Sequence, residues 1–269
     1  MRRSLHEAAH EALNACDPQD KCVLTARLKV DVAAGRLTLR PDEAAQPIGD
    51  AGRPERPVLV APEKVPNRRL SAAGGHAALL HAIAHIEFNA INLALDCVYR
   101  FRGLPDDFYS SWIDVAVEEA EHFQLVCTRL SRLGAAYGDF PAHNGLWEMA
   151  VKTADDPLAR MALVPRVLEA RGLDATPPIV AKLRTIGDVD TLAVLDIIMS
   201  DEIEHVALGD RWFRYFCAQR GLDPESTYLA LIDAFDAPWP RPPLNRVART
   251  AAGFSAAELD RLEQPRIRH

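Results

Sequence analysis

The chain has 269 residues, of which 48% are hydrophobic and 26% charged, and its formal net charge is −7. These values are typical of a globular protein and do not favour a broad surface for nucleic acid or anionic membranes. No run of about 18 apolar residues predicts a membrane span, and no apolar stretch follows the N-terminal arginines as in a secretion signal. The five cysteines are scattered without a Cys-x-x-Cys pair, so we expect a cytoplasmic protein.

The first part of the chain, residues 1–69, is expected to form a helix and an extended arm that pack on the core. Residues 4–15 predict a short amphipathic helix. The next segment, residues 22–39, fits either a helix or a strand pair that turns at Gly35. Six prolines between residues 41 and 66 exclude a regular helix there, so we interpret this stretch as an arm over the surface.

The helical core is expected over residues 70–221. Proline-free apolar runs predict helices over residues 76–102 and 107–133, and Asp106 or Asp107 is the expected cap of the second. A further short helix is expected over residues 144–153.

The second half of this core begins at Asp156-Pro157, a typical helix start. We expect this helix to bend at Pro165 and to stop at Gly172. Thr176-Pro-Pro then predicts a short helix to about residue 185, and residues 188–220 predict one long helix that ends at Gly221.

The last part, residues 222–269, is predicted to be a helical tail. It contains a helix near residues 224–235, a proline-rich turn, and a final helix whose start carries a capping box, Ser255-Ala-Ala-Glu258.

The motif Glu-x-x-His occurs three times, whereas composition alone predicts about half a match. Two copies, Glu119–His122 and Glu202–His205, lie on apolar helical runs. Each follows a lone glutamate at almost the same distance, 32 residues after Glu87 and 33 after Glu169. The third copy, Glu7–His10, has no such partner, and we interpret it as a chance match on a solvated face.

Burial distinguishes these glutamates from ordinary surface acids. Residues three, four and seven apart share one face of a helix. The faces around Glu87, Glu119 and Glu202 are apolar and contain no Lys or Arg, so each carboxylate needs a partner or a metal ion there. Glu169 shares its face with Arg166, which also fits a structural role, but its matching offset supports a ligand.

Four carboxylates and two imidazoles on four helices are the ligand set of a dinuclear metal site in a four-helix bundle. The predicted metal ligands are Glu87, Glu119, His122, Glu169, Glu202 and His205.

Two further pairs of residues are candidates for the surroundings of this site. His81 and His85 point away from Glu87, and we expect a hydrogen-bonded polar seam, with a role at a substrate or beside the ligands as the alternative. Metal-bound histidines usually donate their other N–H to a carboxylate or carbonyl. We therefore expect Asp201 to orient His122, and Glu118 to orient His205.

The order Glu, Glu-x-x-His, Glu, Glu-x-x-His resembles the ferritin-like di-iron superfamily. The acid at Asp201 is also similar to the Asp-Glu-x-x-His of ribonucleotide reductase small subunits and bacterial multicomponent monooxygenases. More closely, the chain resembles the uncharacterised family called domain of unknown function 455, in residues 52–57, 81–92 and 201–209. The resemblance implies an all-α fold: a ferritin-like four-helix bundle with one long crossover, an N-terminal proline-rich arm and a C-terminal helical tail.

The favoured function is an O₂-using oxidoreductase, a hydroxylase or oxidase of a small or modified substrate, with an electron donor. Iron is the expected metal, and manganese or zinc are the alternatives. Iron storage is a second hypothesis, although the arm and tail fit a hollow shell of short subunits poorly. A tRNA-modifying hydroxylase is a third; the tail is locally basic, but the net charge argues against nucleic acid. Whether the protein forms a homodimer is left open by the sequence. The tail arginines are Arg241, Arg246, Arg249, Arg261, Arg266 and Arg268.

Overall fold

A computed structural model of the protein describes residues 3–39, 44–66 and 69–266; Pro41 of the predicted arm and Arg268 of the basic tail lie outside them. The described chain is helical, as predicted, apart from strands β1 (Arg3–Ser4) and β2 (Leu37–Thr38), which pair in parallel. It divides into two compact units, Met1–Val151 and Lys152–His269, called unit 1 and unit 2 below. The predicted division at residues 69 and 221 stays a prediction.

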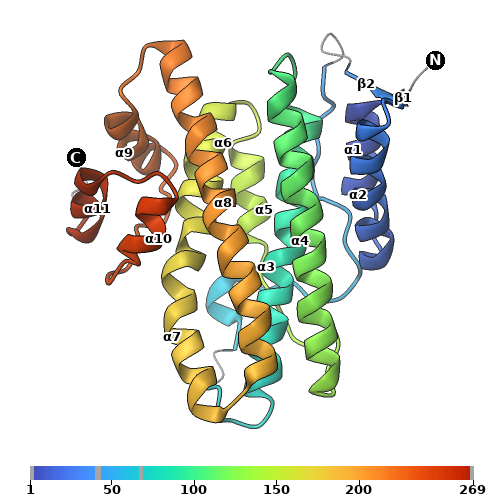
Figure 1. Ribbon diagram of the computed structural model, residues 1–269, viewed down its shortest axis with the longest axis vertical. Helices are drawn as coiled ribbons and strands as arrows, with labels where there is room; N and C mark the ends of the chain where they lie inside the picture. The colour runs from blue at the N-terminus through green and yellow to red at the C-terminus, as the bar shows by residue number, and fades with distance from the viewer. Residues whose placement is uncertain (1–2, 40–43, 67–68, 267–269) are drawn as a thin grey trace. The chain divides into compact units, whose positions relative to one another are not determined.

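Unit 1 is built around one long antiparallel helical hairpin. Its helices α3 and α4 lie side by side, and α1 and α2 pack beside them (Figure 1). The helix α2 settles the alternative left open for residues 22–39, because it continues to Ala33 before the chain turns at Gly35 into β2. The helices are α1 (Leu5–Asn14), α2 (Pro18–Ala33), α3 (Gly75–Arg100), α4 (Asp106–Arg132) and α5 (Gly145–Lys152).

Helix starts in unit 1 differ in how they are capped. Glu7, in the motif interpreted as a chance match, forms a capping box with Ser4 at the start of α1. The predicted cap of α4 is wrong: Pro105 occupies the cap position, and Asp106 and Asp107 lie inside the first turn. Their charges still favour the helix, because the first turn carries the positive end of its dipole.

The proline-rich arm is fixed to the rest of unit 1 by main-chain hydrogen bonds. Its described part, residues 44–66, contains only the three-residue turn η1 (Pro62–Lys64) as helix. Ala142 accepts from the amide of Val60 and donates to the carbonyl of Val58. The indole Nε1 of Trp147 donates to the carbonyl of Gly49 at 2.8 Å. The prolines exclude a regular helix, and the arm is extended. These main-chain amides and carbonyls form their hydrogen bonds with residues outside the arm instead of within a helix.

Helix α3 is apolar along most of its length, and every residue from Glu87 to Tyr99 is buried. By length and composition alone it could cross a membrane, but 72% of its most apolar stretch is buried within the structure. Such burial fits the core helix of a soluble protein better than a membrane span.

Unit 2 contains a second long hairpin and three tail helices. Its first arm passes from α6 through a π-helical segment, η2, into α7 without a break, and α8 returns alongside (Figure 1). The short helix α10 was not predicted. The elements are α6 (Pro157–Leu163), η2 (Val164–Glu169), α7 (Ala170–Ile186), α8 (Val189–Arg220), α9 (Pro224–Ala234), α10 (Arg246–Ala251) and α11 (Ala256–Glu263).

The predicted helix end at Gly172 is wrong, because α7 continues through Gly172 and through Pro177 and Pro178. A proline inside a helix leaves the carbonyl four residues earlier without its donor. Here the side chain of Asn245 donates to the carbonyl of Leu173 at 3.1 Å and takes the place of the missing amide of Pro177. A contact from the distant tail thus lets the helix pass a sequence that would stop it locally.

Candidate metal centre

The two ligand groups predicted from the sequence lie in different units. Glu87, Glu119 and His122 belong to unit 1, and Glu169, Glu202 and His205 belong to unit 2. Each group is described below within its own unit.

In unit 1 three predicted ligands converge at the hairpin. Glu87 is on α3, and Glu119 and His122 are one turn apart on α4, so they share a face of that helix. Each offers a ligand atom, and these atoms lie within 4.8 Å of one another. His122 Nδ1 is 3.3 Å from Glu87 Oε2 and 3.5 Å from Glu119 Oε2. Sequence spacing therefore predicted a cluster that the structure of this unit contains.

These three side chains are almost inaccessible to solvent, with exposed fractions of 3% for Glu87 and 1% for Glu119 and His122. Burial, and then the charge of Glu119, raise the pKa of the Glu87 carboxyl. Burial lowers the pKa of His122, but hydrogen bonds to Glu119 and Glu87 outweigh it and raise that pKa well above its ordinary value. The cluster thus favours bound positive charge, either as protons or as a cation.

The donor set of the cluster fits a metal ion. Carboxylate oxygens with an imidazole nitrogen bind iron, manganese and zinc. Two buried carboxylates beside one imidazole keep an excess of negative charge, which a divalent cation would neutralise. A buried group of Glu87, Glu119 and His122 is therefore a candidate for holding a metal ion.

The seam expected around His81 and His85 is present and is hydrogen-bonded. His85 contacts the hydroxyl of Tyr137 at 2.9 Å and the carbonyl of His143 at 3.1 Å. His81 Nε2 accepts from the amide of Gly138 at 2.9 Å. Burial lowers the pKa of His85 to about 4, so its ring is neutral near pH 7. The seam joins α3 to the loop after α4; a role at a substrate stays a prediction.

In unit 2 the remaining predicted ligands lie on two different kinds of helix. Glu202 and His205 are one turn apart on α8; His205 is buried, and Glu202 is half-buried. Glu169 is the last residue of the π-helical segment η2. Segments of π-helix are rare and occur frequently at functional sites. The π geometry at Glu169 was not predicted, because Pro165 indicated only a bend.

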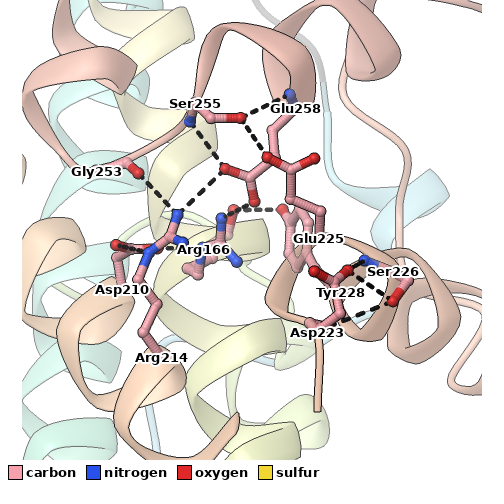
Figure 2. A network of polar contacts seen from close by, with 10 residues as sticks. All are labelled: Arg166, Asp210, Arg214, Asp223, Glu225, Ser226, Tyr228, Gly253, Ser255 and Glu258. Atoms are coloured by element: carbon pink, nitrogen blue, oxygen red, sulfur yellow. Dashed lines mark hydrogen bonds and ion pairs between the residues drawn. The ribbon is translucent and has the colours of Figure 1, made fainter. Parts of the chain in front are cut away.

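Arg166 shares a predicted helix face with Glu169 and therefore weakened the prediction that Glu169 is a metal ligand. In the structure Arg166 forms ion pairs with other acids. Its guanidinium is fully buried and pairs with Asp210 of α8 and with Glu258 of α11 (Figure 2). It also lies 4.2 Å from the ring centre of Tyr228, a cation–π contact. Arg166 therefore has its counterions in this network, which ties the π segment to the helix that carries Glu202.

The tail helix α11 completes this network (Figure 2). Glu258 forms the predicted capping box with Ser255 at the start of α11. The same carboxylate also pairs with Arg166. Arg214 bridges the two acids, at 2.8 Å from Asp210 and 3.4 Å from Glu258. Sequence reasoning found Glu258 as a cap but missed its ion pair, because its partner lies 92 residues earlier.

The two acids predicted to orient the histidines are placed on the expected helices. Glu118 is on α4 and Asp201 is on α8, and both are half-buried. Their pairing with His205 and His122, respectively, would join the two units and stays a prediction.

These features define an all-α protein with a buried carboxylate–histidine cluster able to hold a metal ion. Comparison with known protein families shows which family the chain belongs to. The chain matches a protein family of unknown function, DUF455, over residues 14–260, and belongs to that family. It is 44% identical over 259 residues to an uncharacterised protein of Haemophilus influenzae, a match that covers 93% of this chain and 90% of the relative. No solved structure matches it significantly.

Proposed function

We propose that this protein is a ferritin-like dinuclear metal carboxylate protein of the cytoplasm that acts as an O₂-using oxidoreductase. In the proposed four-helix bundle with one long crossover, each unit supplies two helices and three ligands. Iron is the expected metal, and manganese or zinc are alternatives. The proposed ligands are Glu87, Glu119 and His122 from unit 1, and Glu169, Glu202 and His205 from unit 2.

The observation that carries the proposal is the buried cluster of Glu87, Glu119 and His122. Two carboxylates with exposed fractions of 3% and 1% lie against a single imidazole. Burying charge in this way destabilises a protein unless a cation or hydrogen bonds compensate. The second helix pair repeats the same order of ligand types at almost the same spacing, which supports a second half of the site.

When bound, a pair of such ions supplies the activation of O₂, which amino-acid side chains cannot provide. The residues of the chain hold and shield the ions. Glu87 and Glu119 would neutralise their charge, and His122 would bind through Nδ1, the atom that faces both carboxylates. The burial of this group excludes water and so strengthens each electrostatic contact.

The proposal is tested by metal analysis of protein taken from its native cells, followed by reconstitution with iron(II). We expect two ions per chain and consumption of O₂ by the loaded protein. Glu119→Ala and Glu202→Ala should each lose at least one ion, because each removes a ligand.

The matched controls are Glu121→Ala and Glu204→Ala, since both residues are exposed and lie two positions from the ligands on the same helices. Glu7→Ala, in the third Glu-x-x-His, should also bind normally. Loss of metal in the controls as well would show that the ligand pairs are wrong. If Glu202→Ala keeps full metal while Glu119→Ala loses it, the site belongs to unit 1 alone and is not dinuclear across the repeat.

A further inference from the structure

A wide groove in unit 2 has none of the proposed metal ligands in its lining. It has a volume of about 1260 Å³ and is lined by one side of α7 and by the proline-rich segment between α9 and α10. Its charged lining residues are Arg171, Asp174, Asp236, Arg241 and Arg266. A hollow of this size can receive a small molecule.

The acids of this groove are already neutralised by arginines. Asp174 pairs with Arg249 at 2.7 Å, and Asp236 pairs with Arg266 at 3.4 Å. Arg171 and Arg241 have no acidic partner among the described residues. Among the charged lining residues that the structure describes, three arginines thus face two aspartates, and Arg171 and Arg241 are the arginines without an acidic partner.

The two unpaired arginines line the same groove. Arginine side chains are always charged in proteins. Two like charges in one groove repel each other, and an anion bound to both would relieve the repulsion. Guanidinium groups bind phosphate in a planar, two-point geometry.

The lining of the groove also has an apolar part. It contains Trp239 together with Pro177, Pro178, Pro238 and Pro243. The indole is held in place, because its Nε1 donates to the carbonyl of Gln264 at 3.0 Å and the guanidinium of Arg261 lies 5.0 Å from its ring centre. A fixed aromatic wall binds planar rings without a large loss of side-chain entropy.

We infer that this groove binds a phosphorylated small molecule with a planar ring, of the nucleotide class. The phosphate contacts Arg171 and Arg241, and the ring packs against Trp239 and the prolines. This inference does not depend on the metal site. A small ligand fits better than RNA, because the chain has a net charge of −7.

Calorimetric titration of the full chain with AMP, adenosine and inorganic phosphate tests the inference. AMP should bind saturably and more tightly than either of its parts. Arg171→Gln and Arg241→Gln should each weaken AMP binding by about 10-fold, the expected loss of one charge-assisted contact. Trp239→Leu should weaken AMP binding but leave phosphate binding unchanged.

The matched control is Arg184→Gln, because Arg184 is an exposed arginine on the same helix, α7, outside the groove. It should bind AMP as the wild type does. The thermal midpoints of the Arg171 and Arg241 variants should equal or exceed that of the wild type, since each change removes a repulsion. The inference is overturned by absence of saturable AMP binding, by equal weakening in Arg184→Gln, or by a short RNA that binds more tightly than AMP.

Discussion

The two units carry the same pattern of acids and histidines but hold it by different means. In unit 1, Glu87 lies in a regular helix, and every residue from it to Tyr99 is buried. In unit 2, Glu169 ends a π-helical segment that is fixed by the buried ion pairs of Arg166 (Figure 2). Apolar packing supports the first arrangement and a specific ionic network supports the second. The units should therefore differ in which substitutions they tolerate.

The largest expected effect is that of removing the central cation of unit 2. Arg166→Met should lower the free energy of unfolding by about 3–5 kcal/mol, because it leaves buried Asp210 and Glu258 without their buried counterion and with only the partly exposed Arg214. Arg214→Met is the control, since Arg214 pairs with the same acids but is 38% exposed; its loss should cost about 1 kcal/mol or less. Urea unfolding measures both, and equal small losses would contradict an essential buried network.

The next effect concerns the packing of the π segment. Gly209 of α8 lies against Pro165, and a Cβ added there would be 2.2 Å from the proline Cβ. Gly209→Ala should therefore lower the stability by about 1–3 kcal/mol, since the rigid ring and the two backbones must move apart. Its midpoint in urea should fall.

Gly172→Ala is the matched control, because Gly172 is also a helical glycine of unit 2 but has no atom within 4 Å of an added Cβ. Alanine has the higher helix propensity, so this variant should gain about 0.5–1 kcal/mol. A gain in both variants would mean that α8 and η2 do not approach as closely as described.

The same contrast explains which parts of the fold could be predicted from the sequence. Helices α3, α4 and α8 were predicted to within a few residues, because glycine or proline bounds each proline-free apolar run. The path through Gly172 and Pro177 was not, since it depends on Asn245, about 70 residues later. The close approach of Gly209 to Pro165 in the π segment is likewise a contact between distant residues, which no local pattern predicts.

The residues of the candidate site also fall into those that the sequence predicted and those that it did not. Glu87, Glu119 and His122 could be predicted because helical spacing and apolar neighbours are local signals. The partners of Arg166 could not, because a charged residue on a helix face indicates nothing about which distant acid it meets.

In unit 1 the sensitive feature is the buried charge itself. Metal-free Glu87→Gln should be more stable than the wild type by roughly 1 kcal/mol, because it removes one buried like charge. Burial and Glu119 raise the pKa of Glu87, so its ionised form is destabilised in the folded state. The folded wild type then loses stability as the pH rises above the ordinary carboxyl pKa, and the advantage of the variant should grow in that direction.

This prediction is checked by thermal unfolding in chelator between pH 5 and about 8, followed by the same measurement with added iron(II). The metal should raise the midpoint of the wild type more than that of Glu87→Gln, because a ligand that binds the folded state stabilises it. A variant less stable than the wild type in chelator would show that the carboxylate is already well compensated.

The smallest effect is expected for the exposed ion pair between α2 and α4, Lys29 and Asp114, whose charged atoms are 2.9 Å apart. The hydrogen bond to Asp114 raises the pKa of Lys29 despite slight burial. Both side chains are about half exposed, so Asp114→Asn should cost only about 0.5 kcal/mol at low salt. This cost should disappear near 1 M NaCl, where the screening length falls to about 3 Å. The loss in Arg166→Met should instead persist at high salt, because buried charges are screened much less. Urea unfolding of both variants at two salt concentrations thus separates this exposed ion pair of unit 1 from the buried network of unit 2, and a salt-independent loss for Asp114→Asn would contradict the distinction.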